Sequence, residues 1–253
     1  MNLFKTTKPV PSFRDQIYVA DKQLSPEFCR ACIEKFESDP CVESGVTGRG
    51  HAVETKQSDD LMISKYNRWN KEDTQVATAL SKNLNNFSVE FQNKYNWHVV
   101  KELHDTGYQI QRTHPNGFYH WHSDDAKSTR HYTFIFYLND IDNGGYTEFI
   151  DGTRIQPKAG RFLLFPATDI YVHRGTAPKD EIKYILTGWL HREFGGDTRI
   201  KGDWHNLITA PPEINPTIND LPQNRFDAED SHITLIEGEE LDIEDNNVQM
   251  ILE

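Results

Sequence analysis

Apolar positions in the first hundred residues recur every three or four residues in two stretches, which is typical of amphipathic helices. The first stretch opens on Ser25-Pro26, a serine suited to the N-cap and a proline suited to the first helical position, and Asp39-Pro40 stops it. We therefore predict a helix from residue 25 to about residue 38. A second, longer helix is predicted from about Asp73 to Lys94. Its apolar stripe consists of Val76, Leu80, Leu84, Phe87 and Phe91.

From Gly107 onward the pattern becomes strand-like, with segments rich in β-branched and aromatic residues between turn signals such as His114-Pro115-Asn116-Gly117. Strands are predicted at 108–113, 118–123, 131–138, 146–150, 161–165, 170–173 and 182–189, after an early short strand at 16–20. No helical pattern separates the later segments. The chain is therefore predicted to be α+β, mainly β, with a barrel or sandwich and not a parallel α/β sheet.

The three cysteines lie close together, at Cys29, Cys32 and Cys41. An odd, sparse count does not make a disulfide framework. The Cys29-x-x-Cys32 spacing also occurs in redox and zinc sites, but no second CxxC or HxxxH pair accompanies it. Cys29 and Cys32 instead share a helix face with Ile33 and Phe36, so we interpret them as small buried hydrophobes.

Charge is distributed unevenly along the chain. The net charge is −12, and residues 219–253 alone carry eleven acidic residues against Arg225, a net charge of −10. Such a tail would repel a nucleic-acid backbone, so no nucleic-acid partner is expected. The tail is either a solvated arm or a docking element for a basic partner, and residues 233–236 and 241–243 could pair as a hairpin.

No apolar run approaches the roughly 20 residues that a membrane helix needs. The N-terminus also lacks an apolar signal-peptide core. We therefore expect a cytoplasmic protein without membrane contact.

The most informative residues are His122-Ser123-Asp124 on a predicted strand and His173 about fifty residues later. Residues i and i+2 of a strand point to the same face, so His122 and Asp124 aim together, and one further histidine completes a two-histidine, one-carboxylate set. Such a set binds iron(II) and leaves three coordination positions open, two for a chelating oxoacid and one for dioxygen. Lys183 lies ten residues after His173, where an ammonium group inside a barrel would need an anion such as the distal carboxylate of 2-oxoglutarate.

Six motifs surround these residues in a definite order. They are Tyr119-His120-Trp121-His122-Ser123-Asp124, Tyr137-Leu138-Asn139, Gly144-Gly145-Tyr146-Thr147-Glu148-Phe149, Gly160-Arg161-Phe162-Leu163-Leu164-Phe165, His173-Arg174-Gly175 and the segment from Lys183 to Leu190. Over residues 112–191 this order resembles the catalytic domain of the prolyl 4-hydroxylase-like 2-oxoglutarate/iron(II) oxygenases. The resemblance implies a double-stranded β-helix, or jelly roll, with supporting N-terminal helices. It implies an oxygenase domain at 1–198, with helical support at 21–100 and the barrel core at 101–194, followed by an acidic extension at 199–253.

The resemblance also implies roles for individual residues. Fe(II) would be held by His122, Asp124 and His173, and the cosubstrate 2-oxoglutarate by Lys183, with O2 as the second cosubstrate and ascorbate as a further candidate cofactor. Tyr119 and Trp189 would be catalytic residues lining the site, and Tyr119 and Thr147 would lie beside the cosubstrate. The family often has a tyrosine nine residues before the first metal histidine, where this chain has Thr113, whose hydroxyl has a shorter reach.

Alternative assignments remain open at this stage. His120-Trp121-His122 matches the HxH of a cupin, although a cupin would supply a glutamate a few residues further on, and His120 could instead support the site from behind. Asp125 is a second candidate carboxylate, but strand alternation turns it away, so we favour Asp124. The HxD pair could also be a chance feature of a solvated strand, and Lys183 a rim lysine in a surface salt bridge.

The resemblance favours hydroxylation of peptidyl proline to 4-hydroxyproline, as in procollagen-proline 4-dioxygenases. The alternatives are a hydroxylase of a free amino acid or of another protein side chain, and a non-catalytic jelly-roll module with an acidic docking tail. The expected partner is a peptide or protein substrate containing proline, and the oligomeric state stays open. Residues 43–65, with their glycines and polar side chains, are either a lid over the mouth or an ordinary surface loop.

Overall fold

The computed structural model describes residues 8–47, 52–96, 103–125 and 130–192. The helices are α1 (Pro26–Glu37) and α2 (Asn70–Tyr95), with short 3-10 turns at Arg14–Gln16, Ile63–Lys65, Asn67–Trp69 and Asp169–Tyr171. The strands are β1 (Tyr18–Ala20), β2 (Glu43–Ser44), β3 (Asp59–Met62), β4 (Leu103–Asp105), β5 (Gln109–Thr113), β6 (Tyr119–His122), β7 (Arg130–Tyr137), β8 (Thr147–Phe149), β9 (Arg154–Ile155), β10 (Phe162–Pro166), β11 (His173–Gly175) and β12 (Lys183–Arg192).

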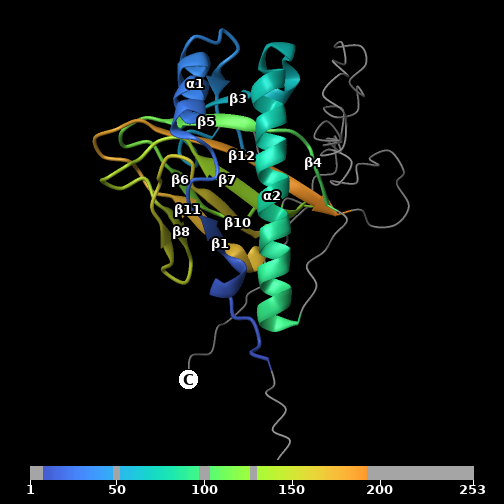
Figure 1. The fold of residues 1–253 in the computed structure, drawn as a ribbon. Helices are drawn as coiled ribbons and strands as arrows, with labels where there is room; N and C mark the ends of the chain where they lie inside the picture. Colours follow the sequence, from blue (N-terminus) through green and yellow to red (C-terminus); the bar gives the residue numbers. More distant parts are fainter. Residues whose placement is uncertain (1–7, 48–51, 97–102, 126–129, 193–253) are drawn as a thin grey trace, which may run out of the picture.

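These strands form two antiparallel sheets of a jelly roll, which confirms the predicted fold class (Figure 1). The larger sheet has the order β1-β10-β7-β12-β5-β3-β2, with β4 also paired to β12. The smaller sheet has the order β6-β11-β8-β9. Several neighbouring strands are far apart in sequence, as in β10 beside β7 and β11 beside β6, which is typical of jelly-roll connections.

Both predicted helices are confirmed. Ser25 caps α1, because its Oγ accepts a hydrogen bond from the amide of Phe28 at 3.1 Å. Helix α2 begins at Asn70, slightly earlier than predicted, because a 3-10 turn leads directly into it, and it ends at Asn96 in the left-handed conformation with φ 56°. Both helices cover the larger sheet (Figure 1).

The cysteines on α1 are packed as predicted. Cys29 and Cys32 are buried, and burial raises the pKa of Cys29 to about 11 and that of Cys32 to about 12. Thiols with such pKa values stay protonated near neutral pH, which does not suit redox chemistry or metal binding. In the described ranges they also join no cluster of metal-ligating groups.

Most predicted strands are confirmed, but the one at 170–173 is wrong. Residues 169–171 form a 3-10 turn, and β11 begins only at His173. Ile170 is exposed, and the ring of Tyr171 stacks on Phe13 at 4.4 Å instead of joining a strand ladder. The early strand likewise begins at Tyr18 and not at residue 16, because a 3-10 turn precedes it.

The segment 43–65 was expected to be a lid or a surface loop, and neither description fits its second half. Residues 59–62 form β3, which pairs with β5 inside the larger sheet. Leu61 and Ile63 are fully buried, so this part of the segment belongs to the core.

The core consists of two apolar clusters. The larger cluster fills the space between the helices and the larger sheet, and includes Phe36, Val76, Phe87, Phe134 and Phe136. The smaller cluster lies between the sheets, because it combines Ile135 and Phe165 of the larger sheet with Phe149 and Ile155 of the smaller one. Strand β7 therefore buries both of its faces.

Two further expectations concern other parts of the chain. Within the described segments, no helix combines the length and apolarity that crossing a bilayer would require. The acidic extension at 199–253, with its expected hairpin, lies outside the described residues.

Candidate metal centre

Three predicted ligand residues lie together at the smaller sheet. His122 ends β6, Asp124 follows two residues later, and His173 opens β11, where it pairs directly with His122. One nitrogen or oxygen atom from each of the three side chains lies within 4.8 Å of the other two. The Nε2 atoms of His122 and His173 are 3.8 and 3.7 Å from the two carboxylate oxygens of Asp124. In the described part of the chain this is the one such group, and its spacing fits a single metal ion.

Main-chain carbonyls orient both imidazole rings. The Nδ1 atom of His122 lies 2.7 Å from the carbonyl oxygen of His120, and the Nδ1 atom of His173 lies 3.0 Å from that of Tyr171. Because only a protonated Nδ1 can donate to a carbonyl, the lone pair of each ring is left on Nε2, facing Asp124. His120 thus supports the site through its backbone, while its ring is exposed and takes no part in the ligand group.

The protonation states also suit metal binding. Burial lowers the pKa of His122 to about 4, with the charge of His173 acting in the same direction. Burial alone would raise the pKa of Asp124, but His173, His122 and a hydrogen bond from Thr133 outweigh it and lower that pKa. Neutral imidazoles and an ionised carboxylate are the forms that bind a metal. Asp125 is exposed, so the structure brings Asp124 and not its neighbour to the site.

Thr133 is a supporting residue that sequence reasoning missed. Its hydroxyl donates a 2.6 Å hydrogen bond to Oδ2 of Asp124, and both side chains are buried. Such hydrogen bonds orient a ligating carboxylate and tune its basicity. No sequence motif marks this threonine, because the contact depends on how β7 lies beside the Asp124 segment.

Lys183 lies at the start of β12. Its side chain is buried, and burial lowers the pKa of the ammonium group to about 8. In the described ranges no carboxylate forms an ion pair with it. A buried cation without a counter-ion is costly, so this position suits the carboxylate of a bound ligand.

The ring of Tyr137 and the strand neighbour Thr113 lie near Lys183. Its Nζ lies 5.8 Å from the ring centre of Tyr137, whose hydroxyl donates a 2.7 Å hydrogen bond to Thr147. Thr113 pairs directly with Lys183 across β5 and β12. Tyr137 was noted in the Tyr137-Leu138-Asn139 motif but given no role from the sequence.

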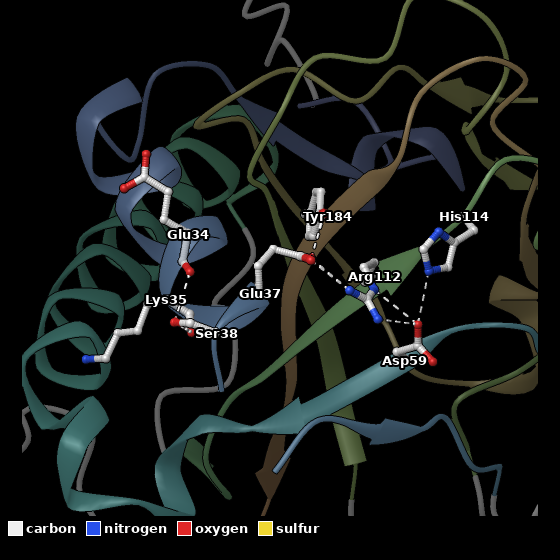
Figure 2. Close-up of polar contacts among 8 residues, drawn as sticks. All are labelled: Glu34, Lys35, Glu37, Ser38, Asp59, Arg112, His114 and Tyr184. Atoms are coloured by element: carbon white, nitrogen blue, oxygen red, sulfur yellow. Dashed lines mark hydrogen bonds and ion pairs between the residues drawn. The ribbon is translucent and has the colours of Figure 1, made fainter. Parts of the chain in front are cut away.

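An ion-pair network on the outer side of the same strands fastens them to α1 and β3 (Figure 2). Arg112, the neighbour of Thr113, contacts Glu37 at 2.8 Å and Asp59 at 2.9 Å. The hydroxyl of Tyr184, the neighbour of Lys183, donates to Glu37 at 2.7 Å. This network holds β3, β5 and β12 in register at the position of the buried lysine.

Tyr119 borders the metal group directly, and Trp189 is the strand neighbour of Thr133, which contacts Asp124. The Tyr119 ring stacks on His122, with ring centres 3.6 Å apart and an angle of 18°. Burial, aided by the charge of Asp124, raises the pKa of Tyr119 to about 12, so the phenol stays protonated. Trp189 pairs across the sheet with Thr133, and its buried indole N–H has no hydrogen-bond acceptor among the described residues.

The fold and this site together define a class: a jelly roll that holds a two-histidine, one-carboxylate group and a buried lysine. Residues 108–191 match the family model described as the 2OG-Fe(II) oxygenase superfamily. This segment, which contains all the motifs from Tyr119 to Leu190, is similar to that superfamily, and the predicted resemblance to prolyl 4-hydroxylase-like oxygenases is confirmed. No curated protein matches the chain in sequence.

Solved structures of prolyl hydroxylases share the fold. The viral collagen prolyl hydroxylase of Paramecium bursaria Chlorella virus-1, in complex with 2OG, aligns with a TM-score of 0.51 and 20% identity over 71% of this chain and 97% of its own. A prolyl hydroxylase from Trichoplax adhaerens, in complex with a hypoxia inducible factor peptide, aligns with a TM-score of 0.55 and 16% identity over 70% and 84% of the two chains. A Pseudomonas putida prolyl-4-hydroxylase aligns with a TM-score of 0.51 and 14% identity over 70% and 93%. At these identities the likeness concerns the fold.

Proposed function

We propose that this protein is a 2-oxoglutarate- and Fe(II)-dependent dioxygenase that hydroxylates peptidyl proline to 4-hydroxyproline. The observation that carries the proposal is the group of His122, Asp124 and His173, with ligand atoms within 4.8 Å of one another. The same roll contains the buried Lys183, which has no ion-pair partner among the described residues. The group of His122, Asp124 and His173 suits a metal ion with open coordination positions, and Lys183 suits one carboxylate of a dicarboxylate ligand.

The residues present fit an iron ion. Two neutral imidazoles whose Nε2 lone pairs face Asp124, together with its ionised carboxylate, make the donor set that non-haem iron(II) prefers, and Thr133 orients the carboxylate. Bound iron(II), together with 2-oxoglutarate and O2, supplies an oxidant that replaces hydrogen by hydroxyl at an unactivated C–H bond, with succinate and CO2 as the other products.

The protein contributes binding, orientation and exclusion of water. Lys183 would pair with the distal carboxylate of 2-oxoglutarate. Thr113, Tyr137 and Thr147 are candidates for further hydrogen bonds to it, because Thr113 is the strand neighbour of Lys183 and the ring of Tyr137, which is bonded to Thr147, has its centre 5.8 Å from Nζ. The buried surroundings of Asp124 keep bulk water away from the reacting atoms.

The substrate would approach on the side of Tyr119 and Trp189. The buried indole N–H of Trp189 needs an acceptor, which a peptide carbonyl of the substrate can provide. Three structural neighbours are prolyl hydroxylases, and one of them holds a peptide fragment, which favours a proline-containing peptide or protein here.

The proposal is tested by incubating the protein with Fe(II), labelled 2-oxoglutarate and proline-containing peptides, with and without ascorbate. We expect peptide-stimulated release of labelled CO2 and a mass increase of one oxygen atom on a prolyl residue. The variant Asp124→Ala is the control and should release none. Turnover that persists in this variant, or hydroxylation confined to free amino acids or to other side chains, would contradict the proposal.

A further inference from the structure

We infer that Lys56 is a positioning residue, which fixes the imidazole of His122 for metal binding by holding Tyr119 and the edge of β6. The inference rests on the metal site of the proposed function, but not on its reaction or substrate. Lys56 belongs to the segment 55–57, which precedes β3 and is not part of any motif described above.

The backbone of the segment 55–57 runs along β6. The amide of Gln57 donates to the carbonyl of Phe118 at 2.8 Å, and the amide of His120 donates to the carbonyl of Thr55 at 2.9 Å. Lys56 lies opposite Tyr119 in an antiparallel bridge. Strand β6 is an edge strand of the smaller sheet, and β11 pairs with one of its two edges. The segment 55–57 covers the other edge of β6.

The side chain of Lys56 connects the two sheets. It is buried, and its Nζ lies 2.5 Å from Oδ2 of Asp60 and 3.4 Å from the carbonyl oxygen of Val46. Asp60 belongs to β3 of the larger sheet, whereas Tyr119 belongs to β6 of the smaller sheet. A buried ion pair gives little net stability, but it fixes one arrangement of the groups around it.

The same segment holds both of the groups that orient His122. The Nζ of Lys56 lies 5.6 Å from the ring centre of Tyr119, within cation–π range, and that ring stacks on His122. The carbonyl of His120, which accepts from Nδ1 of His122, belongs to the residue whose amide is bonded to Thr55. His173 has no such dependence, because Tyr171 orients it. Substitution of Lys56 should therefore loosen His122 but not the other metal ligands.

The chain offers a matched control in Lys35. Its Nζ lies 2.7 Å from Glu72 and 4.5 Å from the ring centre of Trp69. Lys35 thus makes the same kinds of contact as Lys56, a carboxylate and an aromatic face. It joins α1 to α2, on the far side of the larger sheet from the metal ligands.

The test measures the Kd of Mn(II), used as the probe ion, by EPR titration of the full chain, with thermal unfolding of the same samples. We expect Lys56→Met to raise the Kd about tenfold, the lower end of the range for losing an outer support of a ligand. Lys56→Arg should bind Mn(II) with a Kd near the wild-type value, because the cation of the arginine still reaches Asp60. Lys35→Met should lower the Tm and leave the Kd unchanged.

A second variant covers a failure to fold. If Lys56→Met leaves Asp60 buried without a partner and does not fold, the double variant Lys56→Met, Asp60→Asn removes both charges and should show the same weaker Mn(II) binding. Unchanged Kd values in the variants of Lys56, or an equal loss in Lys35→Met, would overturn the inference alone. Absence of Mn(II) binding by the wild-type protein would overturn the proposed function as well.

Discussion

The two sheets of the roll differ in what covers their outer faces. Helices α1 and α2 cover the larger sheet, and a continuous apolar cluster fills the space between them. The outer face of the smaller sheet instead carries a row of charged side chains. Glu148 lies between Arg154, at 2.7 Å, and Arg174, at 2.6 Å, and the guanidinium of Arg174 lies 4.6 Å from the ring centre of the exposed Trp121.

The candidate site is divided between the sheets in a corresponding way. Both imidazoles, of His122 and His173, come from the smaller sheet, whereas Lys183 and Thr133 come from the larger one. The helix-backed sheet contributes most of the buried apolar surface, and therefore most of the stability. Most of the buried apolar surface and both imidazoles therefore lie in different layers, so a substitution in one layer should change mainly one of the two properties.

The strongest test of this division between the two sheets is to remove an imidazole from the smaller sheet. His173→Ala should abolish measurable metal binding, because only two ligands remain, while the unfolding free energy of the metal-free protein stays within about 1 kcal/mol of the wild-type value. Calorimetric titration with Mn(II) and denaturant unfolding check the two halves of this expectation. If the His173→Ala variant does not fold, the stability of the protein depends on the metal-binding sheet as well, which would contradict the division.

The complementary change is made in the larger sheet. Phe134→Ala removes a fully buried ring from the cluster beneath the helices and should cost about 3–5 kcal/mol in unfolding free energy. The folded fraction should still bind the metal with nearly the wild-type Kd, since Phe134 points away from the site. Loss of metal affinity in a sample shown by circular dichroism to be folded would contradict the division of roles.

Lys183 lies in the stable layer but should behave as a functional residue. Because burial lowers its pKa to about 8, the unfolded chain binds more protons between that pH and about 10.5, and the unfolding free energy of the metal-free protein should rise over this range. Lys183→Met should remove the rise and stabilise the protein below pH 8 by about 3 kcal/mol. Urea unfolding at a series of pH values measures both effects.

The protonation of Lys183 should also govern the binding of 2-oxoglutarate. The affinity for 2-oxoglutarate should fall as the pH rises above about 8, because only the ammonium form of Lys183 pairs with the carboxylate. An arginine stays charged over this range, so Lys183→Arg should lose this pH dependence. A pH-independent affinity in the wild-type protein would show that the carboxylate binds elsewhere.

The smallest expected effect concerns Thr133, where the two layers meet. Thr133→Val removes the hydrogen bond to Asp124 and should weaken metal binding by roughly tenfold. Thr187→Val is the matched control, because Thr187 is also buried on the larger sheet and its hydroxyl donates to the backbone carbonyl of Phe134 at 2.6 Å. Equal effects of the two substitutions on metal affinity would remove the special role of Thr133.

The parts of the molecule that sequence reasoning predicted correctly have strong local periodicity. The stripe from Val76 to Phe91 and the capped start at Ser25 both depend on neighbours within a few residues, so α1 and α2 followed from pattern alone. Short strands such as β2 and β9 contain only two residues each, which is too few for alternation to show. The strand expected at 170–173 shows the opposite failure, since an apolar run became a 3-10 turn.

For the candidate site, spacing within one strand was sufficient to align His122 with Asp124, and motif order added His173 and Lys183. The supports could not be found this way. Thr133 and Lys56 reach the ligands through strand neighbours, and strand order in a jelly roll cannot be read from a single sequence. His120 is a further example of what the sequence does not reveal. Its position beside His122 suggested that its ring contributes to the site, whereas its backbone carbonyl makes the contact with His122.

The most direct test of the account is an anomalous-scattering map from crystals of the full chain grown with Mn(II) and 2-oxoglutarate. We expect one ion bound by Nε2 of His122, Nε2 of His173 and a carboxylate oxygen of Asp124, with the distal carboxylate of 2-oxoglutarate on the ammonium group of Lys183. An ion bound by other residues, or a cosubstrate carboxylate that does not contact Lys183, would contradict it.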